Sequence, residues 1–397
     1  MSQYFLNHLG LACALGCDLA QIVDGLFAGD RSRMRTGAPW LEERRGRFGA
    51  IEETLPELPE TLREYDCRNN RLALLVIRQI ESAVAELREN LGARRIGVVM
   101  GTSTSGIASG EARLGLADEG GYSYRHQQQM GGLAEFVARY LQLEGPRITV
   151  STACSSSANA FASARRLLAG NVCDAVVVGG VDTLCGMTVK GFHSLSALSA
   201  GQTQPFSAAR DGINLGEAGA VFVMSREPAR IRLCGVAASS DAHHMSAPHP
   251  QGRGAEASMR GALADAQLDA ADIGYLNLHG TGTAQNDVME AEAAANVLGG
   301  DVPCSSTKPL TGHTLGAAGA LEAAFCWLAL DRGQLPPHAF DGEYDPALRP
   351  LNLFTGVKPP QAPSDVSPPR APRYAMSNSF AFGGSNCSLI LGLQEEY

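Results

Sequence analysis

Short, strongly apolar runs alternate with helix-forming segments along this chain, and this alternation constrains the fold more than any other feature. The segment from Asn69 to Leu91 has apolar residues at helical spacing and stops at Gly92, which predicts a helix. The apolar run 96–100 directly after it predicts a buried strand. We expect further strands at 147–151, 175–178, 220–224, 275–278 and 388–391, and further helices at 156–168, 287–298 and 317–330. Such alternation predicts a layered α/β fold with mainly buried sheets.

The chain divides near Ser225 into two parts of comparable length, 1–225 and 226–397, although no sequence repeat has a readable period. Within the second part, residues 355–373 carry six prolines. Because proline lacks a backbone N–H and fixes φ, this segment predicts an extended surface connection rather than a helix or strand.

Composition and charge exclude several classes of protein. The chain has 32 basic and 41 acidic residues, and its net charge of −9 is the wrong sign for a chain-wide nucleic-acid binder. No apolar stretch approaches the ~20 residues that a membrane span needs. The run 9–17 has the apolar character of a signal peptide, but the first basic residue is Arg31, so the positively charged start is missing. The ten cysteines lack paired metal-ligand spacing and indicate a reducing compartment, so we expect a cytoplasmic protein.

Cys154 is the first candidate for a nucleophile. The predicted strand 147–151 leads into Thr-Ala-Cys-Ser-Ser-Ser, and a predicted helix begins immediately afterwards. A thiol at a helix N-terminus faces the positive end of the helix dipole and unpaired N–H groups, so we expect a lowered thiol pKa. The backbone N–H of Cys154 is also placed to serve an oxyanion hole. The alternative is a small buried cysteine, as we assume for the other nine.

Two histidines and a lysine occupy glycine-rich turns in the second part of the chain. His279 ends the predicted strand 275–278 and enters Gly-Thr-Gly-Thr, where open α/β sheets place ligand-contacting groups; a loop-capping histidine is the alternative. His313 lies in a glycine- and alanine-rich segment that begins shortly before Lys308. Only three lysines occur against 29 arginines, which favours a functional role for Lys308 over a surface one. Glu322, on the following helix, is a candidate buried counter-charge for it.

Two other patterns suggest sites that their spacing does not support. Residues 101–106 follow a strand like a phosphate-binding loop, but Ile107 and Ala108 stand where Lys and Ser or Thr are required. A second cluster consists of Asp241, His243, His244 and His249. Its spacing fits no helical pair or standard ligand motif, so we expect no metal.

Taken together, these pieces resemble the β-ketoacyl-acyl-carrier-protein synthases of the elongating type, the decarboxylating branch of the thiolase superfamily. The resemblance covers nearly the whole chain, and the ordered set of motifs is far more specific than any single one. The matching segments are Gly10 and Gly16, 152–157, 205–217, 239–245, 279–283, 306–320 and 378–386. The resemblance implies a duplicated thiolase fold in five layers, α-β-α-β-α, with the nucleophile in 1–225 and two catalytic histidines in 226–397. It also implies a homodimer.

The same resemblance implies a reaction and a catalytic site. Cys154 would take an acyl group from an acyl-carrier protein. Hydrogen bonds from His279 and His313 would then stabilise the enolate formed when malonyl-carrier protein loses CO2, and the enolate carbon would attack the acyl group. Lys308 would orient and polarise the region of His313, with Glu322 beside it. The product would be a β-ketoacyl chain in fatty-acid or polyene or polyketide synthesis, with no metal or redox cofactor.

The resemblance also implies roles for further residues. Phe382 would be the gating aromatic, with its N–H joining that of Cys154 in the oxyanion hole, and Phe192 would be its neighbour in the acyl pocket. Thr281 and Thr283 would bind the pantetheine arm. The remaining implied residues, two in the substrate-binding turn and two that support the site, are Gly383, Gly384, Asp241 and His244.

The chain also departs from these enzymes. Its first strand contains Asn7 and His8 instead of a basic, valine-rich start, and Ser196 replaces an arginine that in many relatives contacts the carrier protein. Carrier proteins are acidic, so docking still requires a local basic patch. Arg68 and Arg71, at the head of the first long helix, are our candidates.

Three other functions are weighed against this one. A silent chain-length partner of a ketosynthase is opposed by the presence of all three residues of the Cys-His-His set. A CoA-dependent thiolase is opposed by the two-histidine pattern, and a nucleotide-binding enzyme by the missing phosphate motif. The sequence leaves open the acyl chain length, the pathway, and whether the partner in a dimer is a second copy or a ketosynthase-like subunit.

Overall fold

The computed structural model describes residues 3–37, 40–41, 46–114, 121–356 and 371–394. Over these residues the strands are β1 (Tyr4–Ala12), β2 (Arg35–Thr36), β3 (Arg47–Gly49), β4 (Ile96–Gly101), β5 (Arg147–Val150), β6 (Ala175–Asp182), β7 (Leu215–Gly216), β8 (Ala218–Ser225), β9 (Ile231–Ser240), β10 (Tyr275–Asn277), β11 (Pro303–Ser305), β12 (Asn352–Leu353), β13 (Tyr374–Phe380) and β14 (Ser385–Leu393). The α-helices are α1 (Leu19–Ala28), α2 (Arg68–Arg78), α3 (Glu81–Leu91), α4 (Ile107–Glu111), α5 (Gly131–Tyr140), α6 (Ser156–Ala169), α7 (Gly186–Ser194), α8 (Arg253–Ala266), α9 (Ala284–Leu298), α10 (Lys308–Thr311) and α11 (Ala318–Arg332).

The main sheet consists of two similar halves. Its strand order over the described residues is β12-β11-β10-β13-β14-β9-β1-β8-β6-β4-β5. In the first half β5, β4 and β6 are parallel, and β8 and β1 continue the sheet antiparallel. In the second half β11, β10 and β13 are parallel, and β14 and β9 continue it antiparallel. The halves join where β1 pairs with β9 through Tyr4 and Phe5. The chain leaves the first half at the end of β8, and the division into two domains after Ser225 stays a prediction.

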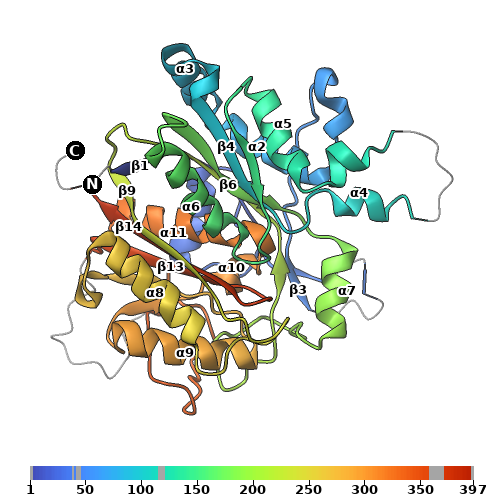
Figure 1. The fold of residues 1–397 in the computed structure, drawn as a ribbon. Coiled ribbons are helices and arrows are strands. Elements are labelled where there is room, and N and C mark those ends of the chain that lie inside the picture. The colour runs from blue at the N-terminus through green and yellow to red at the C-terminus, as the bar shows by residue number, and fades with distance from the viewer. Residues whose placement is uncertain (1–2, 38–39, 42–45, 115–120, 357–370, 395–397) are drawn as a thin grey trace.

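Helices form three layers around the two halves of the sheet (Figure 1). Helices α6 and α11 lie in the middle, in contact with strands of both halves. Helices α2 and α5 cover the outer face of the first half, and α8 and α9 cover that of the second. The result is the five-layered α-β-α-β-α arrangement that the family resemblance implies.

The central helices owe their position to small and apolar residues. Helix α11 is buried on nearly all sides, which is typical of a helix that is apolar all round. A Cβ atom added at Gly319 would lie 2.6 Å from the backbone nitrogen of Ala158, so the glycine allows α11 to approach α6 closely. This contact sets α11 directly behind the turn that carries Cys154.

The expected helix at 69–91 is wrong in one respect, because it is two helices, α2 and α3. The break follows Gln79, whose side-chain amide exchanges two hydrogen bonds of 3.0 Å with the backbone of Leu11 in β1. Strands β9 and β13 are additions to the predicted elements. The β13 segment contains Ser377, Asn378 and Ser379, and these polar residues are buried, which hides the strand in a hydrophobicity pattern.

Strand ends bring the chemistry-bearing residues together. The chain reaches Cys154 after β5, His279 after β10 and Phe382 after β13, at one edge of the parallel strands. Most of the proline-rich segment expected to be a surface connection, 357–370, lies outside the described residues. Across the described part of the chain, no helix has the length and apolar character to cross a membrane.

Candidate active site

A cavity of about 450 Å³ lies at this edge of the sheet and fits the size of a small-molecule site. Cys154, His279 and His313, the three residues expected to carry the chemistry, all line it. Other expected residues on its wall are Phe192, Asp241, Thr281, Thr283 and Phe382. The structure therefore brings together residues that are separated by up to 228 positions in the sequence.

Cys154 occupies a sharp turn between β5 and α6. Ala153 before it has a φ of 51°, in the left-handed region, and the N–H of Ser156 bonds back to the Ala153 carbonyl at 3.1 Å. Gly101 packs closely against the start of α6, just after this turn. A Cβ atom added at Gly101 would lie 2.4 Å from the backbone nitrogen of Ser157. The turn holds the Cys154 side chain at the cavity wall, and the residue is only 6% exposed.

The thiol of Cys154 has a higher pKa than the sequence predicted. Burial raises the pKa of the Cys154 thiol to about 11, while the Lys308 charge and the Phe382 backbone N–H oppose the rise. The expected lowering of the pKa by the helix N-terminus is therefore wrong for the free protein, because desolvation of the thiolate is the larger effect. The thiol is protonated at neutral pH and loses its proton when it reacts.

His279 and His313 lie side by side as neutral imidazoles. Their ring centroids are 5.3 Å apart with the ring planes at 88°. Burial, and next the nearby Lys308 charge, hold the pKa of both rings well below the usual 6.5. A neutral imidazole carries one N–H, so each ring can donate one hydrogen bond without bringing a charge.

Two acidic residues on α9 hold the loop that carries His279. Glu290 accepts hydrogen bonds from the backbone N–H groups of His279 (2.7 Å) and Gly280 (2.6 Å). Asp287 accepts one from Gly282 at 3.2 Å. Burial raises the pKa of Glu290 to about 7 and that of Asp287 to about 6. Neither residue was predicted from the sequence; the signal available was an i, i+3 acid pair on the helix directly after the glycine-rich turn.

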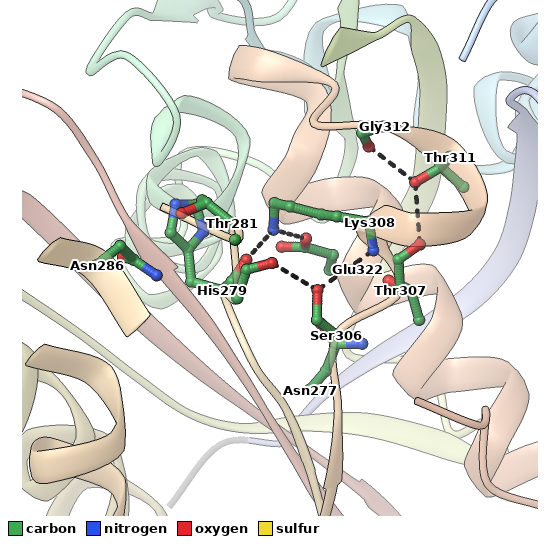
Figure 2. Close-up of polar contacts among 12 residues, drawn as sticks. Asn277, His279, Thr281, Asn286, Ser306, Thr307, Lys308, Thr311, Gly312 and Glu322 are labelled. Carbon is green, nitrogen blue, oxygen red and sulfur yellow. Dashed lines mark hydrogen bonds and ion pairs between the residues drawn. The ribbon is translucent and has the colours of Figure 1, made fainter. Parts of the chain in front are cut away.

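Lys308 lies behind the two histidines and is 1% exposed. Its ammonium donates a hydrogen bond to the backbone carbonyl of His279 and forms an ion pair with Glu322, as Figure 2 shows. The expected ion pair with Glu322 is present. The ammonium is hydrogen-bonded to the loop that carries His279 and not to His313, and the role of Lys308 in orienting and polarising the region of His313 stays a prediction. Lys308 still acts on both rings through its charge.

His313 is held by backbone bonds to the chain that lies across it. Its N–H donates to the Asn214 carbonyl at 2.7 Å, and its carbonyl accepts from the Gly216 N–H at 3.0 Å. Gly312, just before it, has a φ of 70°, and an added Cβ would lie 2.5 Å from the Leu215 carbonyl oxygen. These contacts fix the position of His313 relative to His279.

The loop 101–106, which resembles a phosphate-binding loop, has a partner within the protein. The buried carboxylate of Asp182, at the end of β6, accepts hydrogen bonds from the backbone N–H groups of Ser103 (2.8 Å) and Thr104 (3.0 Å). It also accepts one from the Gly316 N–H at 2.6 Å. Asp182 therefore joins this loop to the turn after His313, and the donors that a phosphate would use are occupied.

Two aromatic residues cover the cavity beside Cys154. The rings of Phe192 and Phe382 have centroids 5.4 Å apart. The hydroxyls of Thr281 and Thr283 are 2.9 Å apart on another part of the wall. Gly383 and Gly384 have φ values of 86° and 75° and form the turn between β13 and β14. They shape the position of Phe382 instead of lining the cavity.

Comparison with models of protein families shows the family of this chain. The family model for the N-terminal domain of β-ketoacyl synthases matches residues 67–229, and the model for the C-terminal domain matches residues 230–340. The chain belongs to the β-ketoacyl synthase family. It is an acyltransferase with the thiolase fold, and its reaction class is the ketosynthase-type condensation of fatty-acid or polyketide chain elongation.

Relatives of this synthase match it over 81% to 99% of its length. Nodulation protein E of Rhizobium meliloti (strain 1021) is 34% identical over 97% of each chain. The 3-oxoacyl-[acyl-carrier-protein] synthase 2 of Staphylococcus aureus is 30% identical over 81% of this chain and 83% of its own. A chain from the solved complex of the ketosynthase ApeO with its chain length factor ApeC, from Xenorhabdus doucetiae, is 44% identical with a TM-score of 0.92, over 99% of this chain and 98% of the other.

Asp241 and His244, both expected to support the site of this synthase, have different surroundings. Asp241 lines the cavity, accepts a hydrogen bond from the Asn386 side chain at 2.8 Å, and receives the N–H of His249 at 3.0 Å. His244 is exposed, and its Nδ1 accepts from the N–H groups of Ser246 and Ala247 in its own loop. The structure does not bring His244 to the cavity wall. No group of three or more metal-ligating side chains is gathered in the described part of the chain.

The two arginines expected to bind the carrier protein both have partners within the synthase. Arg68 forms an ion pair with Glu217, whose buried carboxylate also accepts the Ile51 N–H at 2.9 Å. Arg71 makes two hydrogen bonds of 2.6 Å with Asp66. Both positive charges are therefore paired with carboxylates of the same chain without a bound protein. Carrier docking at this place stays a prediction.

Proposed function

We propose that this synthase joins an acyl group, received on Cys154, to the carbanion that malonyl-acyl-carrier protein forms when it loses CO2. The observation that carries this proposal is the meeting of Cys154, His279 and His313 on one cavity wall. One thiol can hold the acyl group while two neutral imidazoles donate hydrogen bonds to the second substrate. That division of labour is what a two-substrate condensation requires.

The first half-reaction is a thioester exchange. The sulfur of Cys154 attacks the carbonyl carbon of the acyl-carrier-protein thioester, the bond to the carrier sulfur breaks, and the thiol proton passes to that sulfur. The N–H groups of Cys154 and Phe382 stabilise the negative oxygen, and the Phe382 N–H lies within hydrogen-bonding reach of the attacking sulfur.

The second half-reaction begins with the malonyl thioester in the emptied part of the cavity. The C–C bond to the carboxylate breaks, CO2 leaves, and the electron pair moves into an enolate. Neutral N–H groups of His279 and His313 donate to the enolate oxygen, where charge develops. The enolate carbon then attacks the acyl carbonyl, the bond to the Cys154 sulfur breaks, and that sulfur takes a proton from solvent.

The substrates reach this site on carrier proteins. The paired hydroxyls of Thr281 and Thr283 offer polar contacts to the amides of a pantetheine arm. Phe382 lies in a glycine turn, which allows its ring to move away from Phe192 and admit an acyl chain. The relative in complex with a chain length factor favours a ketosynthase of the polyketide or polyene type that works in a dimer.

The test of this function is intact-mass spectrometry of the purified protein with a panel of acyl-carrier proteins. We expect one acyl group per chain, located on the proteolytic peptide that contains Cys154. Addition of malonyl-carrier protein should discharge it, with release of CO2 and formation of the β-ketoacyl product. Absence of an adduct with every acyl chain would contradict an independent enzyme and favour the silent partner. Activity with acetyl-CoA in place of the malonyl substrate would favour a thiolase.

The pKa shifts predict that pH acts differently on the reactivity of the Cys154 thiol and on the release of CO2. Alkylation of Cys154 by iodoacetamide should accelerate about tenfold per pH unit from 7 to 9, because the thiolate fraction rises in that proportion below a pKa of about 11. Release of CO2 from malonyl-carrier protein should be flat over the same range, because both imidazoles are already neutral. An alkylation rate that has levelled off by pH 7 would contradict the raised thiol pKa.

A further inference from the structure

His338 is a buried histidine that the mechanism above does not use. It follows α11 in a Leu-Pro-Pro-His segment and is 2% exposed. Its backbone N–H donates to the Phe354 carbonyl at 2.5 Å, which holds it beside the second half of the sheet. Burial lowers the pKa of His338 to about 4, so the ring is neutral at physiological pH.

The ring of His338 connects two separate segments near the cavity. The backbone N–H of Ser306 donates to its Nδ1 at 3.0 Å, and its Nε2 lies 3.1 Å from the Pro205 carbonyl oxygen. A backbone N–H can only donate and a carbonyl can only accept. The two partners therefore fix the neutral tautomer with the proton on Nε2.

Through Ser306, His338 is connected to the loop that carries His279 and to Lys308. The Ser306 hydroxyl donates to the Gly280 carbonyl at 2.7 Å and accepts the Lys308 N–H at 3.3 Å (Figure 2). The Lys308 ammonium in turn bonds the His279 carbonyl. His338 thus holds the residue that supports the His279 loop from behind.

The Pro205 side reaches the same loop from the opposite direction. The N–H of Phe206 donates to Asp287 at 2.8 Å, and the other oxygen of Asp287 accepts the Gly282 N–H at 3.2 Å. The Phe206 carbonyl accepts the Asp345 N–H at 2.9 Å, which ties this segment to the chain that follows His338. The loop that carries His279 is therefore held at Gly280 and at Gly282 by two paths of hydrogen bonds and backbone, and both paths begin at the His338 ring.

We propose that His338 is a positioning residue for the decarboxylating half of the reaction. Its ring sets the distance between the Ser306 and Pro205 segments, and through them the orientation of His279. Cys154 stands on the turn before α6, outside both paths, so the acyl-transfer half should not depend on His338. This assignment rests on the proposed function for its reaction step, and its structural part can be measured independently.

The experiment compares His338→Phe, which keeps an aromatic ring without a hydrogen-bonding nitrogen, with the wild-type protein by hydrogen–deuterium exchange and by the two half-reactions. Losing the two ring bonds should speed amide exchange in peptides covering 279–283 and 305–308 by about tenfold, while peptides of α6 stay unchanged. Release of CO2 from malonyl-carrier protein should fall by about tenfold to a hundredfold, because a small displacement of a catalytic group has costs of that order. Acylation of Cys154 should stay within about twofold of wild type.

Two control variants separate positioning from general loss of stability. Leu335→Ala removes a buried side chain three residues before His338 and should leave the ratio of the two half-reactions unchanged. His8→Gln changes an exposed histidine and should change nothing. Unchanged exchange in 279–283 of His338→Phe, or equal loss of both half-reactions, would overturn the assignment. If the wild-type protein released no CO2, the proposed function would fail, and the exchange data would still decide whether His338 holds the loop.

Discussion

Cys154→Ala is expected to abolish acyl-enzyme formation and to lower condensation by at least about 10⁴-fold, the scale seen when a covalent nucleophile is removed. Cys154 is the one sulfur on the wall of the cavity as the described residues form it. Intact-mass spectrometry after incubation with acyl-carrier protein measures the adduct, and chromatography of the β-ketoacyl product measures condensation. We expect neither signal above background.

The same variant should keep most of its ability to release CO2 from malonyl-carrier protein. His279 and His313 are unchanged in Cys154→Ala, and they are the groups that we propose donate hydrogen bonds to the developing enolate. A matched control is Cys173→Ala, which removes another buried thiol at the far end of α6 and should load normally. An acyl adduct on Cys154→Ala, or lost loading in Cys173→Ala, would contradict the assignment of the nucleophile.

That Cys154, His279 and His313 line one cavity could be predicted because the sequence signals for them are local. A cysteine between a strand and a helix, and a histidine in a glycine turn after a strand, are visible within about ten residues of sequence. Parallel strands place their carboxyl ends at one edge of a sheet, so such residues meet in the folded protein. The layered α/β fold follows from the same alternation of strands and helices.

The direction in which the pKa of the Cys154 thiol shifts could not be predicted, because it depends on burial and not on the helix alone. The sequence shows the helix N-terminus, which favours the thiolate. It does not show that the folded chain buries the Cys154 side chain, which is only 6% exposed, and so removes the thiol from water. Desolvation then outweighs the favourable local charge.

The acidic residues that hold the site were missed for a related reason. Asp182 and Glu290 look like ordinary charged residues in the sequence, yet both are buried and surrounded by backbone N–H donors. The situation at Arg68 is the reverse, and its role in carrier docking stays a prediction. A basic residue at a helix start suggests a binding surface, whereas its partner Glu217 lies 149 positions away in the sequence.

Lys308→Met is expected to destabilise the protein and to slow decarboxylation at the same time. Removing one partner of a buried ion pair leaves the other charge without compensation, at a cost of about 3–5 kcal/mol in the free energy of unfolding. The variant also loses the hydrogen bond to the His279 carbonyl, so we expect CO2 release to fall by about 10²-fold, the effect of losing one preorganised group. Urea unfolding measures the first effect and CO2 release the second.

The double variant Lys308→Met/Glu322→Gln separates these two effects. Replacing the carboxylate by a neutral amide removes the uncompensated charge, so much of the stability should return. The His279 carbonyl still lacks its donor, so CO2 release should stay low. Recovery of both quantities together would mean that Lys308 serves stability alone, and a low CO2 release in a stable protein would place it in the catalytic machinery. The raised pKa of Glu322 agrees with this direction, because a carboxyl that resists ionisation depends on the lysine for its charge.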